Sequence, residues 1–120
     1  MAQNVEVEEA IKALRAQPGS EGYVLINFDG IPIRHDLDPK YGDPVQYAAQ
    51  IADLVMKTKQ TLKDLAIPDP EFVNLRMRTK QETEIIVTDC ISNNQEYILV
   101  AIQDCRFNKK EEEVKEEEKV

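Results

Sequence analysis

The chain has 120 residues, 42% of them hydrophobic and 32% charged, which is ordinary for one domain with a single core and a short appendage. Its 15 basic and 23 acidic residues give a net charge of −8, which disfavours nucleic acid as a partner because phosphates require clustered lysine and arginine. No apolar run approaches the roughly 18 residues that span a bilayer, and the N-terminus has no signal-peptide pattern, so we expect a soluble, intracellular protein without membrane insertion.

The first predicted element is an amphipathic helix over residues 5–16. Val7, Ile11 and Leu14 recur at a helical spacing, and charged side chains fill most of the other positions. Pro18-Gly19 ends the segment. Because its apolar stripe is narrow, this helix is expected to cover only part of a sheet.

Residues 22–34 predict a β-hairpin. Apolar residues alternate on both sides of Asp29-Gly30, a dipeptide typical of the two-residue type I′ turn, and this turn places Phe28 opposite Ile31 on the apolar face. Pro32 has no N–H to donate to a neighbouring strand. The return strand is therefore expected at an edge of the sheet, with its outer side blocked.

A long helix is predicted from Pro44 to about Leu65, because Asp43 is a favourable N-cap and proline suits the first helical position. Its apolar positions span an arc of about 160°, whereas packing on one surface needs only about 100°. We predict that the surplus edge, rich in small residues, contacts the same helix of a second copy; the alternative is a helix that is simply well buried. The helix residues expected in this dimer interface are Ala48, Ile51, Ala52, Val55 and Lys59.

Three strands are predicted after this helix. Residues 72–79 alternate apolar and polar side chains and contain no proline, so nothing prevents pairing along their free edge. Residues 84–91 form the next strand, a polar loop covers 92–95, and residues 97–102 are apolar on both faces, as expected of a central strand. The strand residues expected in the dimer interface are Val73, Leu75 and Met77.

The C-terminal sequence KKEEEVKEEEKV has no apolar stripe that would pack it against a domain. We therefore divide the chain into a domain over residues 1–107 and a charged tail over residues 108–120. A solvated tail is the simpler interpretation, and an acidic arm for a specific partner is the alternative.

No catalytic constellation is found, so we expect no enzyme activity, no cofactor and no metal site. His35 is the only histidine, and Cys90 and Cys105 are too few for a zinc site and are expected to be reduced thiols. Arg76 and Arg78 are compatible with an anion site, but alternating charges on a strand more often pair with neighbours such as Glu82 and Glu84.

Four segments together resemble the roadblock family of dynein light chains: GYVLINFDGIPIR, QYAAQIADLVMKTKQTLKDL, NLRMRTKQETEIIV and YILVAIQ. The resemblance covers about residues 5–103. It implies an α/β sandwich, that is, a five-stranded antiparallel sheet with a short N-terminal helix on one face and a long helix on the other. It also implies a homodimer in which the long helices pack together and the strand with Arg76 and Arg78 continues the sheet into the second copy.

The partner implied by the resemblance is a dynein intermediate chain. The expected function is a dimeric adaptor that pairs these chains and supports microtubule-based transport or ciliary motility, in the cytoplasm on the cytoskeleton or in a cilium or flagellum. Related modules are scaffolds or regulators of small GTPases, which is the alternative function.

One helix covers only about two of five strands, so the face with the short helix is expected to keep bare apolar surface. We predict that an amphipathic helix of the partner lies on this face. The residues expected to bind it are Val7, Ile11, Leu14, Arg76 and Arg78.

Overall fold

The computed structural model describes the backbone of residues 5–106 and the side chains of residues 8–106, so the side chain of Val7 and the predicted tail, 108–120, lie outside the described residues. Within them, the elements are α1 (Val5–Ala16), β1 (Ser20–Ile26), β2 (Pro32–Leu37), the short 3₁₀ helix η2 (Pro39–Tyr41), α2 (Pro44–Asp64), β3 (Asn74–Arg78), β4 (Thr83–Ser92) and β5 (Gln95–Asp104).

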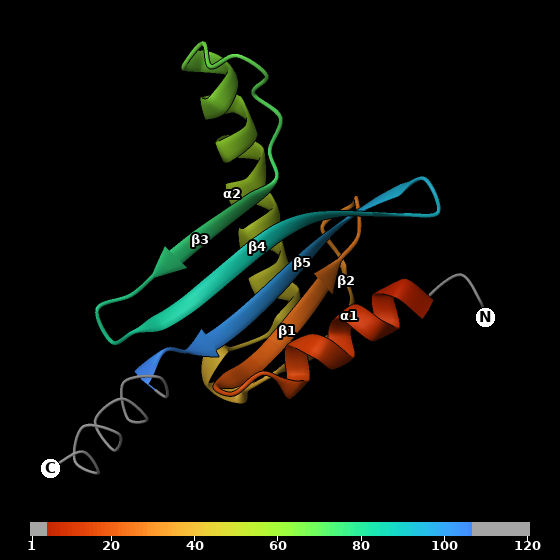
Figure 1. Ribbon diagram of the computed structural model, residues 1–120, viewed down its shortest axis with the longest axis vertical. Helices are drawn as coiled ribbons and strands as arrows, with labels where there is room; N and C mark the ends of the chain where they lie inside the picture. Colours follow the sequence, from red (N-terminus) through yellow and green to blue (C-terminus); the bar gives the residue numbers. More distant parts are fainter. Residues whose placement is uncertain (1–4, 107–120) are drawn as a thin grey trace, which may run out of the picture.

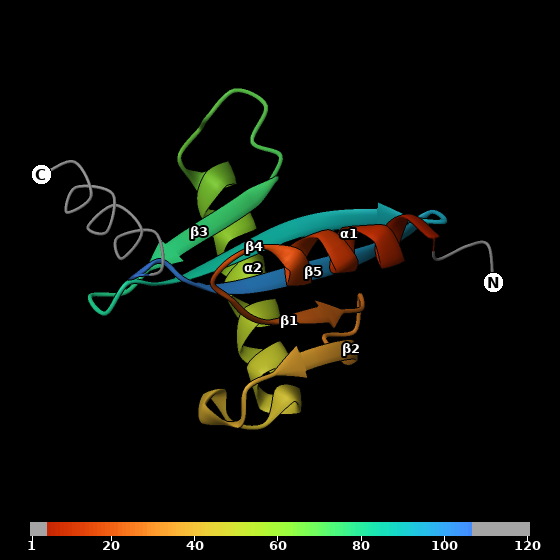
Figure 2. The same ribbon diagram turned by 60° about the horizontal axis from the view of Figure 1, so that its bottom comes forward.

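The five strands form one antiparallel sheet in the order β2-β1-β5-β4-β3. Helix α1 lies on one face of this sheet and α2 crosses the other, as Figures 1 and 2 show from two directions. The predicted fold class is therefore confirmed. Two positions in the sheet are also confirmed, because the strand that is apolar on both faces, β5, is central, and the strand that begins at Pro32 lies at an edge.

The core lies between α2 and the sheet. Val24, Val100 and Val87 are direct neighbours across β1, β5 and β4, and all three are fully buried. From the helix, Ala48, Ile51 and Val55 complete the same cluster, and partly buried side chains such as Leu75 and Met77 pack against it. This contact stabilises the domain mainly through the hydrophobic effect.

Helix α2 begins as the sequence predicts. The side chain of Asp43 accepts a hydrogen bond from the Val45 N–H at 2.9 Å, and Pro44 occupies the first turn, where its missing N–H costs nothing. The helix ends at Asp64, with Leu65 as its C-cap.

The type I′ prediction for the β1–β2 turn is wrong. The Asn27 N–H donates to the Ile31 carbonyl, which makes a three-residue loop in which only Gly30 has a positive φ, 82°. The reason is the Asn27 side chain, whose oxygen accepts from the N–H groups of Asp29 and Ile31, both at 3.0 Å. Phe28 therefore lies in the loop with 81% of its surface exposed, not opposite Ile31 on the apolar face.

A two-residue turn does occur, but between β4 and β5. Asn93 and Asn94 have φ values of 54° and 63°, as both central residues of a type I′ turn require, and Ser92 pairs directly with Gln95. The predicted polar loop is thus part of a hairpin whose strands continue up to the turn.

Helix α1 packs on the β1 side of its face, against β1 (Figure 1). Ile11 is its buried anchor, with 2% of its surface exposed. Arg15 pairs with Asp36 of β2 at 3.0 Å, and Glu8 pairs with Arg34 of the same strand. These contacts fix α1 at one side of the sheet and leave the β3 and β4 side of the face uncovered.

Candidate functional site

The edge strand β3 is the candidate site for pairing with another chain. Within residues 5–106, its only sheet partner is β4. The Asp89 N–H donates to the Val73 carbonyl at 3.0 Å, and the Thr79 N–H donates to the Thr83 carbonyl at 2.9 Å. Because backbone groups alternate in direction along a strand, those of Asn74, Arg76 and Arg78 point to the free edge.

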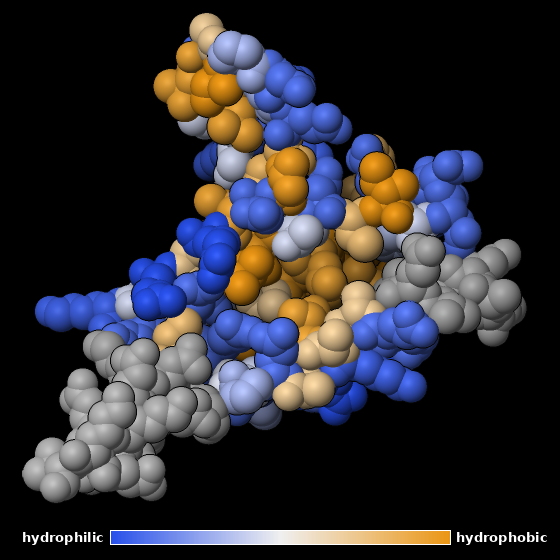
Figure 3. Space-filling view, in the orientation of Figure 1, coloured by the Kyte–Doolittle hydropathy of each residue, from blue (hydrophilic) through white to orange (hydrophobic). Residues whose placement is uncertain are grey.

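Exposed apolar side chains lie just before β3 and at the projecting end of α2. Figure 1 shows that the C-terminal half of α2 extends beyond β3, and Figure 3 shows apolar side chains gathered at its end. Leu65 is 63% exposed, Val73 just before β3 is 65% exposed, and Ile67 is also exposed. An unblocked strand edge beside such a surface is the arrangement in which a second chain gains both backbone hydrogen bonds and apolar contact.

A compact ionic cluster lies beside the edge, on the α1 face of β3 and β4. Glu84 is 5% exposed and accepts from Arg76 Nε at 3.0 Å and from Arg78 Nη2 at 2.8 Å. The hydrogen bonds from Arg76 and Arg78 hold the pKa of Glu84 below its ordinary value. One carboxylate thus holds two guanidinium groups that remain more than half exposed, which leaves the cluster with a net positive charge.

The predicted dimer residues of α2 lie elsewhere than the prediction assumed. Ala48, Ile51 and Val55 belong to the core, with 0, 6 and 3% of their surface exposed, so they have almost no area to offer a second copy. A side-chain carbon added at Gly30 would lie 3.4 Å from the Ala52 Cβ, so half-buried Ala52 lies close to the chain's own β1–β2 turn.

Lys59 is half-buried, and its Nζ lies 3.7 Å from Asp89 on β4. Val73, just before β3, is exposed, whereas Leu75 and Met77 of β3 are half-buried and pack against the core. Of the eight predicted dimer residues, Val73 is therefore the one with the most free apolar surface at the edge.

The residues predicted to bind a partner helix fall into two groups in the structure. Ile11 is buried beneath its own helix, α1, and Leu14 is half-buried. Arg76 and Arg78 form ion pairs with Glu84. Between α1 and these arginines, the same face of the sheet carries half-buried apolar residues, Ile86 on β4 and Leu99 on β5. Figure 3 views this face and shows apolar side chains in its middle.

In the described part of the chain, no three His, Cys, Asp or Glu side chains are placed to hold a metal ion. His35 is exposed on β2, and Cys90 and Cys105 are half-buried. Among residues 5–106, no helix combines the length and the apolar character that a membrane crossing requires.

Sequence reasoning missed Phe28 and Met56, which are 81% and 70% exposed and face a groove beside α2. The sequence signal for the exposure of Phe28 is Asn27, because an asparagine side chain two residues before Asp29-Gly30 can accept hydrogen bonds from the backbone of a longer turn.

One family model and several solved structures match this chain. The family model described as the Roadblock/LC7 domain matches residues 6–103. Among solved structures, MglB of Myxococcus xanthus is 18% identical, with a TM-score of 0.67 over 86% of this chain and 79% of that one. The gliding protein MglB of Thermus thermophilus is also 18% identical, with a TM-score of 0.68 over 87% and 75%. An MglB with a tetrameric arrangement is 17% identical, with a TM-score of 0.65 over 87% and 74%.

Proposed function

The chain belongs to the Roadblock/LC7 family, and from this premise we propose that it is a non-catalytic, dimeric scaffold or regulator of a small GTPase. The observation that carries the proposal is the similarity to MglB proteins over nearly the whole described domain. GTPase regulation is one of the two functions that the family resemblance implies, and the relatives found in structure favour it over the dynein function.

The dimer is proposed from the geometry of β3. Two copies related by a twofold axis would pair their β3 strands antiparallel through the outward backbone groups of Asn74, Arg76 and Arg78. The same approach would bring the projecting end of α2, with Leu65, toward the second copy. A relative with a tetrameric arrangement is consistent with self-association in this fold.

A dynein light chain that pairs intermediate chains is the second candidate. It is favoured by the apolar surface at Ile86 and Leu99, which lies between α1 and the positive cluster and suits an amphipathic partner helix with acidic residues along one side. Two such sites in a dimer would raise the effective concentration of the paired chains. It ranks second because the structural relatives are MglB proteins.

Affinity purification from the native cell distinguishes the two candidates. The full chain serves as bait, and the eluate is analysed with GDP or a non-hydrolysable GTP analogue in the lysate. We expect recovery of a small GTPase whose retention differs between the two nucleotides. Recovery of dynein heavy and intermediate chains without a GTPase would replace the first proposal with the second, and recovery of neither would contradict both.

A further inference from the structure

An apolar groove lies on the α2 side of the molecule, away from β3. It has a volume of about 340 Å³ and runs between the β1–β2 turn, the middle of α2 and the outer part of the β4–β5 hairpin. Phe28 and Met56, both largely exposed, line it, and Val55 and Ile98 contribute further apolar surface. Large apolar side chains at the mouth of a concave surface are typical of a binding groove.

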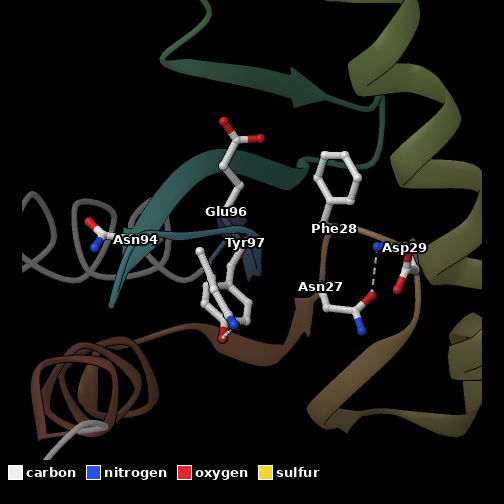
Figure 4. Close-up of a pocket in the computed structure, with 7 residues that line it drawn as sticks. Asn27, Phe28, Asp29, Asn94, Glu96 and Tyr97 are labelled. Carbon is white, nitrogen blue, oxygen red and sulfur yellow. Dashed lines mark hydrogen bonds between the residues drawn. The ribbon is translucent and has the colours of Figure 1, made fainter.

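The groove continues into a second hollow of about 560 Å³, which shares Asn27, Phe28, Glu96 and Tyr97 with it. It exists because β1 ends at Ile26, which pairs with Ile98, while residues 95–97 of β5 continue beyond that pair. Figure 4 shows Phe28 and Glu96 pointing to the same side, with Tyr97 on the opposite side. The two hollows adjoin through these four shared residues, so together they leave room for a segment of several residues.

The rim of the two adjoining hollows is acidic. Asp29 and Glu96 line it, and neither forms an ion pair with a described residue. The other charged pair, Lys59 and Asp89, is mutually neutralised at 3.7 Å. The rim therefore favours cations, in a chain whose net charge is already −8, and it disfavours the carboxylate of a fatty acid.

We propose that this groove binds a short segment of another protein in which an apolar anchor stands beside lysine or arginine. The anchor would fill the space between Phe28 and Met56, and the cation would contact Asp29 or Glu96 at the rim. None of the lining residues belongs to β3 or to the exposed end of α2, so this site does not depend on the proposed dimer or on the GTPase function.

The test is selection from a phage-displayed library of random dodecapeptides on the full chain. Affinities of the selected peptides are then measured for Phe28→Ser, which removes an apolar wall, and for Glu96→Lys, which reverses the rim charge. Val45→Ser and Glu71→Lys are matched controls, because both residues are exposed and lie outside the groove. Oleate, a fatty acid, serves as a second probe, which tests whether the groove binds a lipid chain instead.

We expect enriched peptides that place Leu, Met or Phe beside Lys or Arg. Their affinity should fall at least tenfold for both groove variants, stay within twofold for both controls, and weaken as salt increases. An absence of enriched peptides, enrichment of peptides without basic residues, or equal binding to the groove variants would overturn the proposal. Displacement of the peptides by oleate at a similar affinity would assign the groove to a lipid chain instead.

Discussion

The two edges of the sheet differ in a way that indicates where the molecule associates. Strand β2 begins at Pro32, which cannot donate a hydrogen bond, and Arg34 and Asp36 of this strand are tied to α1 by ion pairs. Strand β3 has no proline and lies beside exposed Leu65 and Val73. The β2 edge therefore carries a proline and side chains that are tied to α1 on the face of the sheet, whereas the β3 edge has no proline and is available to a second chain.

Blocking the open edge should have the largest effect. Asn74→Pro removes an outward N–H without disturbing the hydrogen bonds between β3 and β4, and a symmetric dimer would lose this group in both copies. We expect the dimer dissociation constant to rise about 10- to 100-fold, since each lost hydrogen bond is worth about 1 kcal/mol. Sedimentation equilibrium measures this change. Asn74→Ala is the control, because it removes the same side chain but keeps the N–H, and equal effects of the two variants would contradict the edge pairing.

A charge at the projecting end of α2 tests the apolar part of the same edge. Leu65→Asp should weaken the dimer about tenfold, because the aspartate would lose water where leucine gains apolar contact. Light scattering after size-exclusion chromatography over a dilution series reports the shift. Ile91→Asp, at an equally exposed position in the β4–β5 hairpin, should leave the dimer unchanged; a similar loss in both variants would indicate a non-specific charge effect.

The ionic cluster beside β3 should make the free energy of unfolding depend on pH. The pKa of Glu84 is lowered by its hydrogen bonds to Arg76 and Arg78, so its contribution to stability is present above the ordinary value of 4.5 and is lost as the pH falls through the lowered value. Glu84→Gln should reduce the free energy of unfolding by about 1 kcal/mol at pH 7, because the arginines remain partly solvated.

Urea unfolding at several pH values between 3 and 7 measures this effect. The difference between the wild type and Glu84→Gln should shrink toward the acid end. A difference that is constant over this range would show that the carboxylate charge of Glu84 is not what stabilises the cluster.

The smallest expected effect concerns Tyr47 of α2. Its hydroxyl group is buried, and no described residue forms a hydrogen bond with it. Burial without a partner is unfavourable, so Tyr47→Phe should raise the free energy of unfolding of a single copy by about 0.5 kcal/mol and leave the dimer dissociation constant unchanged. Thermal unfolding at low protein concentration measures the first quantity. A weaker dimer would show that the hydroxyl group finds its acceptor in the second copy.

Local sequence chemistry was sufficient for the elements that depend on near neighbours. Asp43-Pro44 predicted the start of α2, Pro32 predicted an edge strand, and the doubly apolar segment in β5 predicted the centre of the sheet. Each of these signals acts within a few residues or through burial alone, so no knowledge of the tertiary contacts was required.

Other features depend on contacts between distant segments, which the pattern does not contain. The small side chain of Ala52 lies close to Gly30, more than twenty residues away, and the helical pattern alone does not contain this contact. The β1–β2 turn was misassigned because the Asn27 side chain outweighs the preference of Asp29-Gly30 for a two-residue loop. The groove at Phe28 follows from this turn and was therefore missed as well.

Residue-resolved amide hydrogen exchange at low and high protein concentration tests the difference between the two edges most directly. If β3 is the site of self-association, the outward amides of Asn74, Arg76 and Arg78 should exchange more slowly as the concentration rises, while the amides of β2 keep the same rates. Exchange at β3 that is independent of concentration, or protection that develops at β2 instead, would contradict the account.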